Sequence, residues 1–285
     1  MADRAVPLAR AKVNLWLNVV GRRTDGYHLL DSLVAFTDLA DEIDVSAAPD
    51  LTLEIAGPGA GSLRGEADNL VLRAARLLAG RAGLAPRAVL RLTKHIPVAA
   101  GLGGGSADAA AALLALVDLW RVAMPEEELF DLAAELGADV PMCLAGRPAL
   151  VAGVGERLAP APRMPPCAIL LVNPGLPLPT PQVFAARQGS FSAERPAPGG
   201  WPDLASLGRE IAARGNDLTD AAVSLRPEIT SVLQALRGSQ GVVHAAMSGS
   251  GATCFGLYET VEAARHAAAT LPSSWWRHAG QLATS

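Results

Sequence analysis

The sequence predicts an α+β protein with two domains. Its 285 residues suggest about two domains. Half of the residues are hydrophobic, which is enough for a full core without disulfides or a metal. Segments with the alternation of strands are interspersed with segments that have the spacing of helices. We expect the crossover in the proline-rich segment that starts near residue 156, which gives domains of residues 1–156 and 157–285.

The first predicted strand covers residues 13–20. Apolar residues at every second position alternate with asparagine and tryptophan, which is typical of a half-buried strand. Lys12 falls on the polar face beside Asn14, so both side chains can line a common cleft. Lys12 and Lys94 are the only lysines among 24 basic residues. Since arginine and lysine are not interchangeable, this rarity indicates positions where a compact ammonium is needed.

The following segments alternate between turns, strands and one helix. A turn at 24–26 precedes Tyr27 and His28. Short strands are predicted at 33–36, 42–46, 51–55 and 88–93, and a helix is predicted at 69–82, with Gly83 as its stop. The strand at 88–93 leads through Lys94 and Pro97 into a glycine loop.

This loop reads Gly101-Leu102-Gly103-Gly104-Gly105-Ser106 and runs directly into an alanine-rich helix. Glycines let the backbone turn tightly and aim N–H groups at one point, and the start of a helix adds unpaired N–H groups and partial positive charge. Together they indicate a cradle for phosphate. Ser106 is the expected N-cap of the helix that extends to residue 120. A flexible linker is the alternative, although linkers rarely open into a long apolar helix.

The rest of the chain also mixes helices and strands, and it contains no internal repeat. A helix begins at Pro125 with three glutamates in its first turn, and Asp139 follows it in a short connection. We expect strands at 149–154, 168–172, 242–247 and 253–258, helices at 218–225, 227–236 and 261–269, a surface loop at 189–202, and a polar tail. A second small-residue loop, 248–252, lies between the last two strands.

Composition excludes several classes of protein. The net charge of −4 and the absence of a basic stripe argue against nucleic acid as a partner. No apolar run is long enough to span a membrane, and Asp3 and Arg4 precede any apolar run, unlike a signal peptide. The three cysteines are few and widely spaced, as expected for buried thiols in a reducing cytoplasm. The five histidines show no metal-ligand spacing.

The glycine loop does not fit three familiar nucleotide motifs. A Walker loop requires lysine and then serine or threonine after its last glycine, whereas Ser106 and Ala107 follow here. A dinucleotide fingerprint requires a third glycine at Ser106 and an acid about 20 residues later; Asp118 comes too early. The segments that mark protein kinases are missing as well. A different kind of nucleotide site remains.

Pro97-Val98-Ala99-Ala100 and the glycine run resemble the central motif of the GHMP kinases, which include galactokinase, homoserine kinase and mevalonate kinase. Further matches occur in order at 11–15, 26–28, 68–70, 136–141, 179–184, 216–217 and 248–252, so the resemblance covers nearly the whole chain. It implies a two-domain α+β GHMP kinase fold with the active site in the interdomain cleft. ATP is the implied phosphoryl donor, with Mg²⁺ as its expected companion.

The resemblance also implies a substrate and roles for individual residues. The implied reaction phosphorylates the 2-hydroxyl of 4-diphosphocytidyl-2-C-methyl-D-erythritol, an isoprenoid precursor of the non-mevalonate route. Asp139 is the implied base and Lys12 its neighbour. The implied ATP-binding residues are Asn69, Lys94, Pro97, Gly101, Leu102, Gly103, Gly104, Gly105 and Ser106. The implied substrate-binding residues are Asn14, Tyr27, His28, Thr180, Pro181, Phe184, Ser248, Gly249 and Gly251, with Tyr27 and Phe184 stacking on cytosine and His28 at its edge.

Plainer structural roles stand beside these implied ones. Asp139 could be a helix cap, Lys12 a surface lysine, Lys94 a solvated strand end, and Phe184 a core residue. The loop at 248–252 could be an ordinary turn. Ala107 departs from the second serine that many family members carry, and no glutamate for Mg²⁺ is recognisable, so the metal ligands stay unknown.

Two other functions remain open at this stage. The chain could be a kinase for homoserine or mevalonate, neither of which is expected to need the clamp of Tyr27, His28 and Phe184. It could also be a nucleotide-binding protein without activity, although the presence of both Lys12 and Asp139 speaks against that. We expect a monomer or weak homodimer in the cytoplasm, with small-molecule partners and neither nucleic acid nor membrane.

Overall fold

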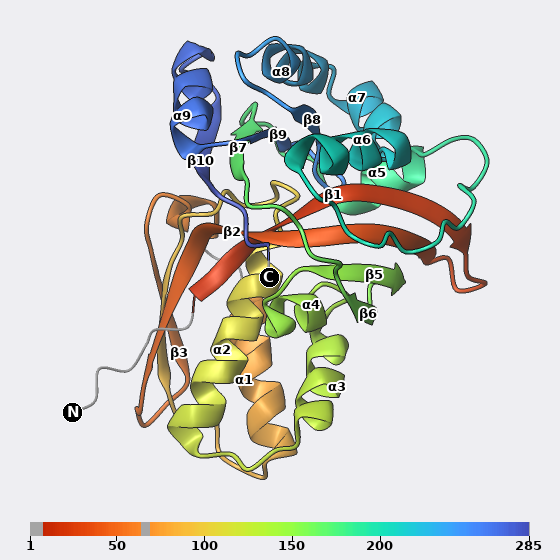
Figure 1. The fold of residues 1–285 in the computed structure, drawn as a ribbon. Helices are drawn as coiled ribbons and strands as arrows, with labels where there is room; N and C mark the ends of the chain where they lie inside the picture. Colours follow the sequence, from red (N-terminus) through yellow and green to blue (C-terminus); the bar gives the residue numbers. More distant parts are fainter. Residues whose placement is uncertain (1–7, 64–68, 285) are drawn as a thin grey trace. The chain divides into compact units, whose positions relative to one another are not determined.

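The structure is a computed structural model that describes residues 8–63 and 69–284 (Figure 1). Asp3, Arg4 and Asp68 lie outside these ranges. The chain forms two compact units: unit 1 comprises Met1–Ala11, Leu39–Val98 and Gly103–Gly146, and unit 2 comprises Lys12–Asp38, Ala99–Leu102 and Arg147–Ser285. The units interleave along the chain because strands β1 (Leu8–Arg22) and β2 (His28–Ser46) each pass from one to the other. The predicted domain boundary at residue 156 stays a prediction.

The described part of unit 1 combines the start of β1 and three further strand segments with four α-helices. The second half of β2 pairs antiparallel with β4 (Val89–Thr93), and β4 pairs in parallel with β3 (Thr52–Ala56). A short 3₁₀ turn, η1 (Ala60–Leu63), follows β3. The helices are α1 (Leu70–Arg81), α2 (Gly104–Trp120), α3 (Glu126–Leu136) and α4 (Val140–Ala145). In Figure 1 α1 and α2 lie side by side, and α3 and α4 pack against this pair.

The alanines of α2 explain this close packing. Ala107 and the alanines at 109–112 are buried, together with Leu113 and Leu116 of the same helix. Small side chains on nearly every face let neighbouring helices approach the backbone of α2, which makes it the centre of the unit 1 core. The start of α2, which carries the glycine loop, is therefore anchored by a well-packed helix.

Unit 2 contains two groups of strands. The first half of β2 pairs antiparallel with β5 (Ala149–Gly153), which pairs in turn with β6 (Arg157–Pro160), and β1 pairs with β2. A separate antiparallel sheet has the order β10-β7-β9-β8. Its strands are β7 (Ala168–Asn173), β8 (His244–Met247), β9 (Cys254–Tyr258) and β10 (Trp276–Gln281).

Five helices accompany these strands in unit 2. They are α5 (Thr180–Ala186), α6 (Leu204–Arg214), α7 (Thr219–Leu225), α8 (Glu228–Arg237) and α9 (Val261–Thr270). Helices α8 and α9 pack against the second sheet, and α7 packs against α5 and α8 (Figure 1). Their apolar faces bury Leu218, Val232 and Leu236 in one core with residues of β7 and β9. None of the helices in the described residues has the length and apolar character that a membrane crossing requires.

Several sequence-based predictions need correction. The strand at 13–20 is not half-buried: β1 is buried on both faces between Ala11 and Val19, so its polar side chains need internal partners. The two strands predicted at 33–36 and 42–46 are one continuous strand, β2. The expected polar tail contains β10, whose six residues pair with β7 although they do not alternate in polarity. Helix α6 was not predicted; a capping box of Asp203 and Ser206 begins it.

Candidate active site

Lys12 and Asn14 lie side by side on β1 in unit 2, as the sequence predicts. The exposed fractions are only 7% for Lys12 and 4% for Asn14. The Lys12 Nζ donates to Asn14 Oδ1 at 2.6 Å. Lys12 is therefore a buried lysine and not a surface lysine at the start of a strand. The ammonium is held in a confined, polar place, where electrostatic interactions are less screened than in water.

The second small-residue loop contacts this pair. Residues 248–253 connect β8 to β9, and the Ser248 Oγ accepts a hydrogen bond from the Asn14 backbone N at 3.1 Å. A Cβ on Gly249 would lie 3.0 Å from Asn14 Oδ1 and 3.6 Å from Lys12 Nζ. Only glycine therefore lets the loop backbone come this close. The loop is more than a turn between strands, because it forms a wall beside Lys12 and Asn14.

Asn216 holds the second loop in this position. Its Nδ2 donates to the carbonyl oxygens of Met247 at 2.9 Å and Gly249 at 2.8 Å. The loop also contacts the entrance to the first glycine loop, since the Ser248 Oγ donates to the Gly101 carbonyl at 3.5 Å. Sequence reasoning matched Asn216 to a family motif but assigned it no role. Its position before α7 gave no signal that it would bind a loop so distant in sequence.

The first glycine loop begins in unit 2 and continues in unit 1. Gly101 and Leu102 belong to unit 2, where the Leu102 carbonyl accepts from the Lys12 backbone N at 3.0 Å. From Gly103 onward the loop belongs to unit 1. The backbone of Lys12 is thus tied to the entrance of the phosphate-type loop.

Helix α2 starts earlier than the sequence predicts. The N-cap is Gly103 and not Ser106, because glycine at 103 adopts the left-handed φ of 66° and lets the helix begin at Gly104. No side chain in the described part of the chain caps this end. The first N–H groups of the helix, including that of Ser106, have no intrahelical acceptor. Such an end is suited to bind an anion such as phosphate.

Asp139 stands at the start of α4 in unit 1. It occupies the N-cap position with φ −86° and ψ −13°, yet its side chain makes no capping hydrogen bond within the described residues. The helix-cap interpretation therefore does not explain this aspartate. Lys12 belongs to unit 2, and the predicted pairing of Lys12 with Asp139 stays a prediction.

The two remaining nucleotide candidates in unit 1 have internal partners. Asn69 is the N-cap of α1 and accepts from the Val71 N at 2.9 Å. Lys94 is buried, and its ammonium binds Asp41 and, at 2.7 Å, the Oδ2 of Asp108. Lys94 is therefore not a solvated strand end. Its predicted contact with the nucleotide stays a prediction.

Asp41 and Asp108 were missed by sequence reasoning. Asp41 also accepts from the backbone N of His95 and Ile96, and Asp108 lies in the second turn of α2. Burial raises the pKa of Asp108 to about 8, although Lys94 acts in the opposite direction. The cluster joins β2, β4 and the start of α2. A Cβ on Gly104 would lie 3.3 Å from the Lys94 ammonium, so the cluster lies directly beneath the first residue of the helix.

His28 and Phe184 meet in unit 2. His28 begins β2 and Phe184 lies on α5, and their rings stack with centroids 5.0 Å apart and planes at 21°. Burial, with the charges of Arg22 and Arg187, lowers the pKa of His28 and favours its neutral form. Tyr27 follows the predicted turn and is 63% exposed. The structure thus brings His28 and Phe184 together and leaves Tyr27 on the surface.

The start of α5 also contacts the second loop. The Thr180 and Ser250 hydroxyls are 2.8 Å apart and share a hydrogen bond. Pro181 occupies the first turn of α5, where its missing N–H costs nothing. The predicted substrate residues of unit 2 therefore lie on a few segments: the middle of β1, the start of β2, helix α5 and the second loop.

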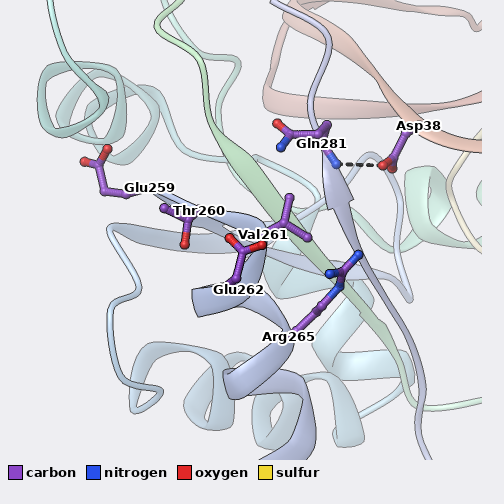
Figure 2. A pocket seen from close by; sticks show the side chains of 7 residues that line it. All are labelled: Asp38, Glu259, Thr260, Val261, Glu262, Arg265 and Gln281. Carbon is purple, nitrogen blue, oxygen red and sulfur yellow. Dashed lines mark hydrogen bonds between the residues drawn. The ribbon is translucent and has the colours of Figure 1, made fainter.

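Two hollows lie in unit 2 outside these motifs. The first, shown in Figure 2, has a volume of about 520 Å³ and is lined by Asp38, Glu259, Thr260, Val261, Glu262, Arg265 and Gln281. The second has about 530 Å³ and includes Leu30, Asp31 and Arg214 in its lining. The Arg214 guanidinium is already paired with Asp31 and Glu210.

Among the described residues, no cluster of histidine, cysteine, aspartate or glutamate could hold a metal ion.

The chain is similar to known proteins over nearly its whole length. The model for the GHMP kinases N terminal domain matches residues 69–147, and the model for the GHMP kinases C terminal domain matches residues 198–277. A protein of Paramagnetospirillum magneticum named 4-diphosphocytidyl-2-C-methyl-D-erythritol kinase is 52% identical over 96% of this chain and 97% of its own length. A protein of the same name from Rhodospirillum rubrum is 50% identical over 99% of this chain and 93% of its own.

Solved structures agree with these relatives. A crystal structure of 4-(cytidine 5'-diphospho)-2C-methyl-D-erythritol kinase superimposes with a TM-score of 0.80 and 40% identity, over 98% of this chain and 99% of that one. Homoserine kinase from Cytophaga hutchinsonii, at 18% identity, shares the fold with a TM-score of 0.68 over 97% of this chain and 96% of its own. The predicted α+β class with two domains is confirmed. With both family models matched and relatives about half identical over nearly its whole length, the chain belongs to the GHMP kinase family.

Proposed function

We propose that this chain transfers the γ-phosphoryl group of ATP to the 2-hydroxyl of 4-diphosphocytidyl-2-C-methyl-D-erythritol, in the non-mevalonate route to isoprenoid precursors. The observation that carries this proposal is the identity of 50–52% to proteins named for that kinase activity, over nearly the full length of both chains. The distant resemblance to homoserine kinase concerns the fold alone. The stacked pair of His28 and Phe184 supports the cytidyl substrate over an acceptor without a base.

ATP binds with its phosphates at the start of α2. Backbone N–H groups of the loop from Gly101 to Ser106 donate to the phosphate oxygens, and the helix end contributes partial positive charge. Pro97, Asn69 and Lys94 contribute to the nucleotide pocket. Because the Lys94 ammonium is already bound to the carboxyl groups of Asp41 and Asp108, Lys94 contributes by placing the loop, and its charge is balanced before ATP arrives.

Phosphoryl transfer then requires positioning and charge neutralisation. The substrate 2-hydroxyl oxygen bonds to the γ-phosphorus while the bond from that phosphorus to the bridging oxygen of ADP breaks. Asp139 accepts the hydroxyl proton. Lys12 provides an ammonium that orients the hydroxyl and stabilises negative charge in the transition state. The confined setting of Lys12, at 2.6 Å from the Asn14 oxygen, supports a role as a fixed point charge.

The cytidyl group is held in unit 2. Phe184 and Tyr27 supply faces for the cytosine ring, and a neutral His28 bonds to its edge, which requires one donor and one acceptor nitrogen. Asn14, Thr180, Pro181, Ser248, Gly249 and Gly251 contact the remainder of the substrate. The shared hydrogen bond of Thr180 and Ser250 supports this grouping, because it links α5 to the second loop.

Mg²⁺ accompanies ATP in this proposal. When bound, it neutralises phosphate charge. It is usually held by one or two protein oxygens and by the substrate phosphates, so a cluster of protein ligands is not required. The Ser106 hydroxyl in unit 1 has suitable oxygen chemistry to hold it.

Further expectations accompany this function. The two family models fall on either side of residue 156, which supports the proposed domains 1–156 and 157–285. Cys143, Cys167 and Cys254 are free thiols, which is compatible with a reducing cytoplasm where ATP is available. We expect a monomer or weak homodimer, which sedimentation velocity at increasing concentration would reveal.

The test of the reaction is the position of the transferred phosphate. Incubation with ATP, Mg²⁺ and the cytidyl substrate is expected to give ADP and a new phosphomonoester whose ³¹P signal couples to no proton, because carbon 2 carries a methyl group and no hydrogen. A signal split by a carbinol proton would place the phosphate on another hydroxyl and contradict the proposal. ADP formed without the substrate would indicate only ATP hydrolysis.

A further inference from the structure

Ser32 lies on β2, fully buried, beside the Lys12–Asn14 pair. Its Oγ is 2.5 Å from the carbonyl oxygen of Trp16 and 2.9 Å from Asn14 Nδ2. A hydroxyl carries one hydrogen, and a carbonyl can only accept. Ser32 must therefore donate to Trp16, and only its lone pairs remain for Asn14. The Asn14 amide can satisfy this arrangement only by presenting its NH₂ group to Ser32.

This constraint determines which end of the amide faces Lys12. With NH₂ toward Ser32, Oδ1 points to the Lys12 ammonium at 2.6 Å. The reversed amide would place NH₂ against an ammonium, and neither group can accept a hydrogen bond. It would also place the amide oxygen against the acceptor side of Ser32. One hydroxyl thus selects the orientation in which Asn14 can bind a cation.

The surroundings of the pair leave few alternatives. Lys12, Asn14 and Ser32 are all buried, so water cannot easily replace a lost hydrogen bond. The Asn14 backbone N is bound to Ser248, and the backbone of Gly249 closes the space next to Asn14 Oδ1. The Asn14 side chain is fixed at its base, and the rotation of its amide is the main freedom left.

We propose that Ser32 is a positioning residue for phosphoryl transfer: it fixes the Asn14 amide so that its oxygen holds the Lys12 ammonium in place. Ser32 acts through Asn14. This inference rests on the proposed kinase function for its kinetic consequences, but the link from Ser32 to Lys12 can be measured without any substrate.

The chain is unusually suited to that measurement. Lys12 and Lys94 are its only lysines, so protein labelled with ¹⁵N-lysine gives two side-chain amine signals. Replacement of Lys94 by arginine assigns them. In Ser32→Ala the amide loses its orienting partner, so the Lys12 ammonium loses its hydrogen bond to Asn14 Oδ1 and its ¹H and ¹⁵N chemical shifts should change. Lys94, bound to Asp41 and Asp108 in unit 1, serves as the internal reference, and its signal should stay in place.

Kinetics provide the second measurement. Ser32→Ala should lower kcat by about 10-fold or more and move the alkaline limb of its pH profile to lower pH, with the KM for ATP unchanged. Ser32→Thr keeps the hydroxyl, so its kcat and the alkaline limb of its pH profile should be close to those of the wild type. Thr37→Val is the matched control, because it removes another buried hydroxyl of β2 in unit 2. It should leave the alkaline limb unchanged.

A double-mutant cycle shows whether Ser32 acts through Asn14. If it does, Ser32→Ala should cost little more in an Asn14→Ala background, because the amide that it orients is gone. Additive losses would overturn the proposal. So would an unchanged Lys12 amine signal in folded Ser32→Ala, or an alkaline limb that moves equally in Thr37→Val. If the wild-type protein did not phosphorylate the cytidyl substrate, the proposed function would fail, and the Lys12 amine signal would still decide the role of Ser32.

Discussion

The imidazole of His28 stacks on the phenyl ring of Phe184, with centroids 5.0 Å apart and planes at 21°. The two rings come from the start of β2 and from α5, which lie far apart in the sequence. Stacking aligns two flat surfaces and keeps the edge of the neutral imidazole available for hydrogen bonds. Phe184 is also partly buried against the core of unit 2, so its position is fixed by packing.

Phe184→Ala should weaken binding of the cytidyl substrate. An aromatic–base stack contributes about 1–3 kcal/mol, so the KM for that substrate should rise by roughly 5- to 160-fold, while the KM for ATP stays the same. Phe191→Ala is the matched control, because Phe191 is an exposed aromatic that packs under Arg187 instead. Equal increases in both KM values would contradict a role in the cytidyl site.

Lys12→Arg should lose most activity although the charge is kept. The Lys12 ammonium lies 2.6 Å from Asn14 Oδ1 and close to the backbone of Gly249, where a wide guanidinium does not fit without displacing the second loop. We expect kcat to fall by at least about 10-fold. The reverse exchange at an exposed position, Arg91→Lys, should have little effect. A rate near that of the wild type in Lys12→Arg would show that any cation suffices.

Asp139→Asn should abolish turnover and preserve ATP binding. The amide cannot accept the hydroxyl proton, and loss of a general base typically costs about 10²- to 10⁴-fold in rate. ATP affinity, measured by calorimetry, should not change, because the base acts on the other substrate. Asp131→Asn, on the exposed face of α3, is the control. Near-normal turnover of a folded Asp139→Asn protein would remove Asp139 from the mechanism.

The sequence was informative where function depends on local pattern. The alternation around residue 13 places Lys12 and Asn14 together, and the glycine run before α2 indicates an anion site. The N-cap was misplaced because serine is the usual cap, whereas Gly103 adopts a left-handed conformation that serine would avoid. Strand β10 was missed because its pairing with β7, rather than its own residues, makes it a strand.

The orienting contacts of the site could not be predicted from the sequence. Ser32 meets Asn14 only because of how β1 lies against β2, and Asn216 meets the second loop across unit 2. Likewise, nothing local in the sequence indicates that Asp41, Lys94 and Asp108 share one buried site. Such contacts depend on strand register and helix packing, which are properties of the folded chain.

The buried Asp108 predicts a dependence of stability on pH. Burial raises its pKa to about 8 in the folded protein, whereas in the unfolded chain an aspartate has a pKa near 3.8. Between these pKa values the unfolded state releases a proton that the folded state keeps. The contribution of Asp108 to the free energy of unfolding therefore falls as pH rises towards 8, and above pH 8 it levels off. Asp108→Asn cannot ionise and keeps an acceptor for Lys94. Its melting temperature relative to wild type should therefore rise between about pH 5 and pH 8; a constant difference would contradict the raised pKa.

The most direct test of the central claim is the specificity constant, kcat/KM, for ADP release with three acceptors: 4-diphosphocytidyl-2-C-methyl-D-erythritol, mevalonate and homoserine. The chain should turn over the cytidyl substrate and leave the other two near background, and Asp139→Asn should remove the signal. Comparable or greater activity on mevalonate or homoserine would contradict the assignment of Phe184 and His28 to a cytidyl site and, with it, the proposed substrate.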